Sequence, residues 1–328
     1  MYFPEPNTPH ANVNIKNSTV EIKNCRGNGI SWGGSTNNGN NQFDIDSSTV
    51  TIDNCAEKNA LGGGGIIGTF DITLTDSDLT VKNNKSYGSN GSNYYLTRST
   101  ATFNDNGTHG MSATNLTMVD STVNADGNGY YGVRAADLFT VDATSKINAT
   151  HNSKTEDGAG LKLTSGVKSG IVESGAEITL TDNYCSGLSN NGNVTFEEGA
   201  KLTITGNVND KGSTSNGGGI YNSGASANLV LPSTAVIYNN HADTAGDDIF
   251  NNTTSKITFG EVGSDWVLDD CNDPIDGWYD DSEGARWEAH TAPYHAEEQG
   301  MRGVGTITGL VALKAAHGLL PVDPDDNP

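Results

Sequence analysis

The stretch NSTVEIKNC, residues 17–25, decides the fold because the chain goes on repeating it. SSTVTIDNC follows at residues 47–55 with the same spacing of Thr, Val, Ile, Asn and Cys. The shared pattern is two apolar residues two positions apart, then two mostly polar residues, then Asn or Cys. The nine copies are TVEIKNC (19–25), TVTIDNC (49–55), DLTVKNN (78–84), TATFNDN (100–106), TVNADGN (122–128), KINATHN (146–152), EITLTDN (177–183), KLTITGN (201–207) and TAVIYNN (234–240).

Each copy lies between two other short apolar elements. A run such as FDI (43–45) or LTMV (116–119) precedes it, and a glycine followed by an apolar residue comes after it, as in GNGI (27–30). Apolar residues that alternate with polar ones predict strands with one buried face. Repeats with three strands predict an all-β protein, a single-stranded parallel β-helix of about nine to ten rungs. The usual hand of β-crossover-β connections makes the expected winding right-handed.

Asparagine dominates the last position of the repeat. Equivalent side chains of successive rungs lie about 4.8 Å apart, and an amide offers both donors and an acceptor. We therefore predict a structural ladder in which each amide binds the next one and the backbone of the turn. The predicted members are Cys25, Cys55, Asn84, Asn106, Asn128, Asn152, Asn183, Asn207 and Asn240.

Cys25 and Cys55 take the first two places in this column. Neighbouring rungs lie within the distance that a disulfide spans, but two small buried thiols would fill the same space. Both alternatives stay open from the sequence. A catalytic thiol is not favoured, because no histidine recurs near either cysteine.

Composition excludes several classes of protein. The 328 residues carry a net charge of −22, which disfavours nucleic acid as a partner. Four cysteines are too few for a disulfide scaffold, and we find no apolar run of about 18 residues that would predict a membrane span. The start, MYFPEPNTPH, lacks the features of a signal peptide, so we expect any leader or anchor to belong to a longer protein.

The chain divides into four predicted parts. Residues 1–11 form a lead-in, 12–260 the β-helix, 261–320 a C-terminal cap and 321–328 a linker. A cap is expected because the end of a solenoid exposes strand edges and apolar core. The cap segment holds three of the four tryptophans, Trp266, Trp278 and Trp287.

Aromatic residues next to the glycines are the candidate binding residues. Exposed rings on a rigid surface suit stacking on a glycan or contact with a protein. In each Tyr-Tyr pair, alternation predicts one ring inside and one outside. The outward rings would line one face, although ordinary packing is an alternative for each. The candidates are Trp32, Tyr95, Tyr131 and Tyr221.

A polysaccharide-degrading enzyme is the second functional hypothesis. Asp46, Asp76, Asp120 and Asp142 recur near the turn before the repeat, and such enzymes need paired carboxylates. Aspartates also start turns by binding their own backbone. We therefore predict no catalytic residues and a protein that is not an enzyme.

No cofactor or metal site is expected. The acidic residues of the cap segment could bind Ca²⁺, but their spacing differs from that of an EF-hand, and a solvated loop is favoured. His290 and His295 are too isolated for a zinc site. The acidic residues concerned are Asp269, Asp270, Asp273, Asp276, Asp280, Asp281 and Glu283.

The rungs that contain NGGGIYNSG (216–224) and AGDDIFNN (245–252) resemble bacterial surface β-helix proteins, namely autotransporter passengers and polymorphic outer-membrane proteins. The segments DGWYDDSEGARWEAH (276–290) and VALKAAHG (311–318) look like those of Gram-positive wall-anchored adhesins. The resemblance implies an extracellular, monomeric adhesin head, followed by stalk modules and a cell-wall anchor, whose partner is a host glycan or surface protein. It implies no site residues. A purely structural spacer is the third hypothesis.

Overall fold

The computed structural model describes most of the first 259 residues. The described ranges are 2–3, 12–32, 41–55, 63–154, 158–210, 215–225, 227–232, 235–238, 240–243, 246–252 and 255–259, together with the backbone of 267–268 and 273–275.

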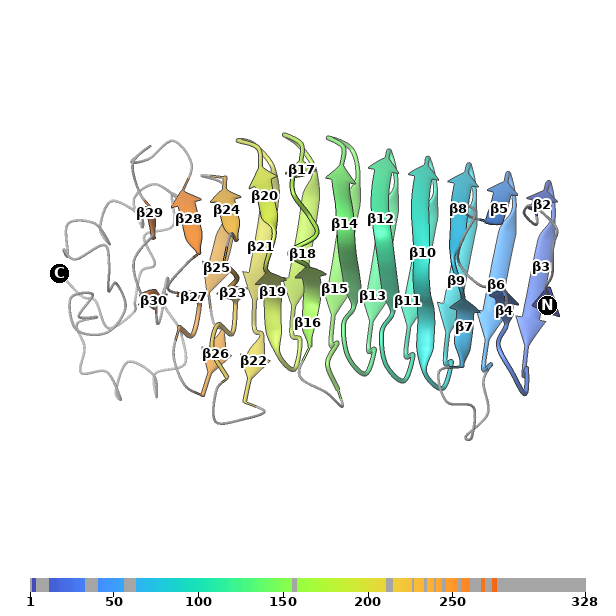
Figure 1. Cartoon of the computed structure of the whole chain (residues 1–328), viewed down its shortest axis with the longest axis horizontal. Helices are drawn as coiled ribbons and strands as arrows, with labels where there is room; N and C mark the ends of the chain where they lie inside the picture. Colours follow the sequence, from blue (N-terminus) through green and yellow to red (C-terminus); the bar gives the residue numbers. More distant parts are fainter. Residues whose placement is uncertain are drawn as a thin grey trace.

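The chain winds into a rod in which strands of successive rungs lie side by side, so that the colours run in sequence order along its long axis (Figure 1). Neighbouring strands of the rungs pair in parallel: Val20 pairs with Val50, and Val50 pairs with Leu79. The described residues form no helix. The protein is a parallel β-helix, as predicted.

All nine copies of the repeat form strands of one sheet. The pairing is in register from Thr19–Lys23 to Val236–Tyr238, which confirms that the copies are equivalent rungs. The strands are β3 (Thr19–Lys23), β6 (Thr49–Asp53), β9 (Asp78–Lys82), β11 (Thr100–Asn104), β13 (Thr122–Asp126), β15 (Lys146–Thr150), β18 (Glu177–Thr181), β21 (Lys201–Thr205) and β25 (Val236–Tyr238).

The remaining faces belong to a second sheet, and there the prediction of three separate strands per rung is only partly right. Between Asn84 and Asn152 the two other elements merge into single long strands. Gly91, with φ of 86°, and shifts in register absorb the bend in the first of these strands. The merged strands are β10 (Tyr87–Thr97), β12 (Met111–Val119) and β14 (Val133–Val141).

Elsewhere the two elements stay separate. The strands that precede the repeat are β2 (Asn12–Lys16), β5 (Asn41–Asp46), β8 (Phe70–Thr75), β17 (Gly170–Val172), β20 (Asn193–Phe196), β24 (Asn228–Leu231) and β28 (Lys256–Phe259). Those that follow it are β4 (Ile30–Trp32), β7 (Gly64–Ile67), β16 (Ala159–Leu163), β19 (Ser186–Asn190), β23 (Ile220–Asn222) and β27 (Ile249–Asn251), and β1 (Tyr2–Phe3) pairs with the first of them. A small third sheet pairs β22 (Val208–Asn209) with β26 (His241–Ala242).

The core is a narrow apolar column inside the rod. In the strands of the repeat, alternate residues point inward, as Val50 and Ile52 do in β6, and both are fully buried. Burying such a side chain stabilises the fold by about 1.5–3 kcal/mol. Tyr94 and Phe103 meet edge to face across this column, with ring centroids 6.0 Å apart. The rod therefore holds its shape through side chains that repeat rung by rung.

Two antiparallel strands cover the last parallel ones. β30 (Asp273–Ile275) pairs with β27, and β29 (Val267–Leu268) pairs with β28. A reversed strand on an otherwise open edge blocks further parallel addition. The predicted tryptophans, the acidic side chains and the histidines of this segment lie outside the described residues. In the part of the chain that is described, no helix is long and apolar enough to cross a membrane.

Candidate functional site

The asparagine column is a continuous hydrogen-bonded ladder, as predicted. Each Nδ2 donates to Oδ1 of the next asparagine, over 2.9 Å from Asn84 to Asn106 and 2.8 Å from Asn207 to Asn240. Asn128 and Asn152 also donate to backbone carbonyls of the preceding rung. Because these amides are buried and bonded to one another, the column holds the turns together and offers no binding surface.

The ladder continues one step beyond the prediction. Nδ2 of Asn240 donates to Oδ1 of Asp248 over 2.8 Å, so that a buried aspartate follows the last amide. The signal in the sequence was the second aspartate of GDDIF, where an asparagine would have fitted the pattern.

Cys25 and Cys55 are free thiols at the other end. The backbone N–H of Cys55 donates to Oδ1 of Asn84 over 2.9 Å, which confirms the place of Cys55 in the column. Burial raises the pKa of Cys55 to about 12, and a hydrogen bond with Cys25 acts in the same direction. A thiol with this pKa is not a nucleophile at neutral pH.

A serine column at the preceding turn was missed. The backbone N–H of each serine donates to Oγ of the serine in the next rung, over 3.0 Å from Ser18 to Ser48 and from Ser48 to Ser77. The signal was the serine before Thr-Val in the opening stretch. The members are Ser18, Ser48, Ser77, Ser99, Ser121 and Ser145.

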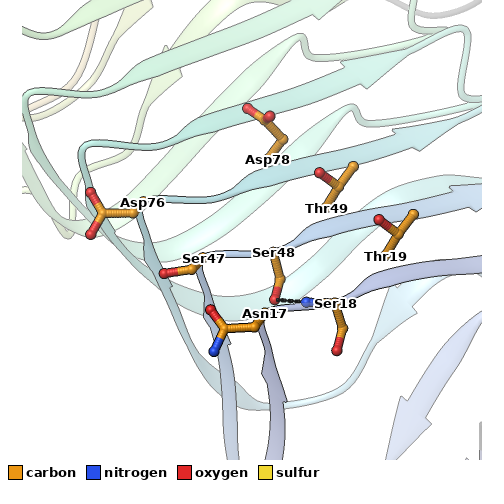
Figure 2. Close-up of a pocket in the computed structure, with 8 residues that line it drawn as sticks. All are labelled: Asn17, Ser18, Thr19, Ser47, Ser48, Thr49, Asp76 and Asp78. Carbon is orange, nitrogen blue, oxygen red and sulfur yellow. Dashed lines mark hydrogen bonds between the residues drawn. The ribbon is translucent and has the colours of Figure 1, made fainter.

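An open groove runs beside the N-terminal end of this column. Figure 2 shows the hydroxyl, amide and carboxylate groups that line it and the hydrogen bond from the N–H of Ser18 to Oγ of Ser48 among them. Asp76 and Asp78 supply the carboxylates among its lining residues. Arg98 binds both oxygens of Asp76, over 2.6 and 2.8 Å, and lowers the pKa of that carboxyl. Several of these polar groups therefore form hydrogen bonds that stabilise the turns, as Ser48 and Asp76 do.

The four recurring aspartates occupy two different positions. Asp76 and Asp120 have positive φ at the turn, with Arg98 in the rung between them. Asp46 ends the strand one residue earlier and forms an ion pair with Lys16 over 2.7 Å. Asp142 accepts the backbone N–H of Asp120 and the hydroxyl of Ser145. These contacts give three of the four a structural role.

Four aromatic rings gather at the turn that follows the ladder: Tyr87, His109, Tyr130 and Tyr131, here called the ring cluster. The ladder explains their position. A Cβ on Gly110 would lie 2.7 Å from Nδ2 of Asn128, so only glycine fits there. Gly88 and Gly132 are confined in the same way. The residue before each of these glycines, Tyr87, His109 or Tyr131, therefore recurs at one place in three successive rungs.

The rings touch one another. The centroid of His109 lies 5.0 Å from those of Tyr87 and Tyr130 and 5.1 Å from that of Tyr131. The rings of Tyr130 and Tyr131 are 3.9 Å apart, and the hydroxyl of Tyr131 donates to that of Tyr130 over 2.8 Å. Contacts of this kind stabilise aromatic pairs beyond their burial. The four rings form one half-buried aromatic surface.

Burial sets the ionisation of the ring cluster. Desolvation lowers the pKa of His109 to about 4, and the charge of Arg134 acts in the same direction. Burial also raises the pKa of Tyr131, and the hydrogen bond to Tyr130 adds to the effect. His109 and Tyr131 are therefore uncharged at neutral pH. Nδ1 of His109 is buried without a hydrogen-bond partner among the described residues.

The candidate aromatic residues lie at different places. Tyr131 belongs to the ring cluster. Tyr221 lies farther along the rod, stacked on Phe250 with centroids 5.8 Å apart. Tyr95 occupies the other arm of β10, in register with Thr73 and Thr117, so the rings do not form a single column. Trp32 ends β4, and its side chain lies outside the described residues.

The two tyrosine pairs behave differently. Tyr94 is fully buried and Tyr95 is 37% exposed, as alternation predicts. The prediction is wrong for Tyr130 and Tyr131, which precede β14 and are both half-buried. Alternation holds only within a strand, and these two residues lie in a turn.

Among the described residues, no group of three or more His, Cys, Asp or Glu side chains could hold a metal ion. No protein-family model, no curated protein and no solved structure matches the chain.

Proposed function

We propose that this chain is the binding head of an extracellular bacterial surface protein, and that the ring cluster is where it contacts a glycan. The observation that carries the proposal is the contact of four rings over three rungs, on the outside of a rigid rod. Sugar rings present apolar C–H faces, and aromatic side chains stack on them without having to be ordered first.

The rigidity of the rod supports this role. Asn106 and Asn128 fix the turns that carry His109 and Tyr131 through buried hydrogen bonds, so the rings are held in place before a ligand arrives. A preorganised site loses less entropy on binding. The proposed partner is a host glycan, and the proposed location is the cell surface, with attachment through further parts of a longer protein.

The proposal is tested by comparing the oligosaccharide affinity of the Tyr131→Ala variant with that of wild type. A panel of neutral and acidic oligosaccharides would first be screened, and the affinities of the ligands found would be measured by calorimetry. We expect Tyr131→Ala to weaken binding by about tenfold or more. Stacking on an aromatic ring contributes about 1–3 kcal/mol per base in nucleic-acid sites, and we expect a stacked sugar to lose an energy within that range.

Tyr95→Ala is the matched control. Tyr95 is an exposed tyrosine on the same strand series, far from the ring cluster in register, and its loss should leave glycan affinity unchanged. Thermal unfolding of both variants separates a lost contact from a lost fold. Equal loss of affinity in both variants would refute the ring cluster as the glycan site. No glycan binding by wild type would refute the proposed function and favour a spacer.

A further inference from the structure

We propose that Arg134 and Lys162 form an anion subsite next to the ring cluster, so that the glycan bound there is acidic and carries carboxylate or sulfate groups. This inference rests on the proposed function and specifies the chemistry of its ligand.

The two cations are direct neighbours. Arg134 of β14 pairs in register with Lys162 of β16, so that both outward side chains occupy the same column of adjacent rungs. Like charges directly opposite each other on neighbouring strands destabilise a sheet. The arrangement therefore carries an electrostatic cost that a bound anion would relieve.

Neither cation has a carboxylate partner among the described residues. Arg134 donates to the hydroxyl of Ser112 over 3.3 Å, and Lys162 donates to the hydroxyl of Ser189 over 2.9 Å and to Oδ1 of Asn191. By contrast, Lys16, Arg98 and Lys201 all form ion pairs on the same rod. In a chain with 40 acidic and 18 basic residues, two adjacent unneutralised cations stand out.

The subsite adjoins the rings. Arg134 follows Tyr131 by three residues, and its charge acts on His109 and Tyr131 as well as on Lys162. Both cations are half-buried, which strengthens their attraction for an anion because solvent screens them less. A sugar on the rings could therefore place a carboxylate or sulfate between the guanidinium and the ammonium groups. Arginine offers a paired-donor geometry that fits either anion.

The test uses a set of matched probes. Trigalacturonate carries carboxylates, its methyl ester has the same skeleton without the charge, and a κ-carrageenan tetrasaccharide carries sulfates but no carboxylate. We expect wild type to bind at least one acidic probe and to bind the methyl ester more weakly. Arg134→Gln and Lys162→Gln should each weaken acidic-probe binding by about tenfold, and added NaCl should weaken it further. The two acidic probes distinguish carboxylate from sulfate as the preferred anion.

Lys168→Gln is the control, because Lys168 is an exposed lysine outside this column, and it should keep the affinity of wild type. The failures are distinguishable. If wild type binds neutral oligosaccharides as well as acidic ones, and the two glutamine variants bind like wild type, the anion subsite is refuted while the glycan site stands. If no probe of either kind binds, the proposed function fails and the subsite with it.

Discussion

Nδ2 of Asn128 donates to Oδ1 of Asn152 over 2.8 Å, and the same nitrogen donates to the carbonyl of Phe103. Oδ1 of Asn128 accepts both the backbone N–H and Nδ2 of Asn106. One fully buried side chain therefore joins three successive rungs. The ladder is a set of such joints, and each satisfies polar groups that no water reaches.

Asn128→Ala should lower the free energy of unfolding by about 3–5 kcal/mol. The substitution leaves several buried donors and acceptors unpaired, at about 1–3 kcal/mol each. Urea unfolding followed by circular dichroism measures the loss. Asn148→Ala is the control, because Asn148 is half-buried and, among the described residues, its amide bonds only to Asn124 on the outer face of the sheet, over 2.9 Å. A loss of about 1 kcal/mol or less is expected there, and equal losses in the two variants would contradict the role of the ladder.

The ladder and the register of the nine strands could be predicted from the sequence because both depend on local spacing. An asparagine at the same offset from two apolar residues constrains the chain rung by rung, and the pairing of Thr19–Lys23 with Thr49–Asp53 follows from that alone. The merging of β10 could not be predicted, since it depends on how Gly91 and its neighbours bend between two faces.

The site was harder to predict than the fold. Tyr131 was a candidate, but His109 was not, because a histidine in THGM shows nothing in the sequence of the rings that surround it. The Tyr-Gly, His-Gly and Tyr-Gly steps at 87–88, 109–110 and 131–132 were the available signal. Arg134 and Lys162 are 28 positions apart in the sequence, and only the pairing register of β14 with β16 brings them together.

Gly110→Ala should destabilise the fold by about 2–4 kcal/mol, since overpacking a tight site forces neighbours to move. The new Cβ would lie 2.6 Å from the carbonyl oxygen of Gly132 and 2.7 Å from Nδ2 of Asn128. Gly27→Ala provides the comparison, because a Cβ there meets nothing within 4 Å. Its free energy of unfolding should change by less than about 1 kcal/mol. If Gly110→Ala unfolds at the same urea concentration as Gly27→Ala, the claim that the ladder leaves no room for a side chain at position 110 is wrong.

Cys55 should react very slowly with a thiol reagent in the native protein. Its pKa of about 12, raised first by burial and then by Cys25, leaves almost no thiolate at pH 8. A variant with serine at the other three cysteines isolates the signal of Cys55, and absorbance after addition of a disulfide reagent follows the reaction. We expect rapid reaction only after unfolding in urea. Fast labelling of the folded variant would show that the thiol is accessible and ionised, contrary to the structure.

Lys162 should cost stability near neutral pH while it serves binding. Burial, followed by the charge of Arg134, lowers the pKa of Lys162 from 10.5 to about 8, and Cys185 acts in the opposite direction. A base whose pKa is lower in the folded state destabilises the fold fully below pH 8, and that cost disappears as the pH rises toward 10.5. Lys162→Met should therefore raise the free energy of unfolding at pH 7 by about 1–3 kcal/mol.

The pH dependence is the decisive measurement, because Lys162→Met also removes hydrogen bonds to Ser189 and Asn191. The gain in stability over wild type should shrink between pH 8 and 10.5, as wild-type Lys162 loses its proton in the folded state. Arg134→Gln removes the neighbouring charge, so in that background the gain should be smaller at pH 7 and should disappear at higher pH. If the difference in free energy of unfolding between wild type and Lys162→Met stays constant across this range, the folded state does not destabilise the charged form of Lys162. A variant that gains stability and loses acidic-glycan affinity would indicate that the cation is kept for binding at the expense of the fold.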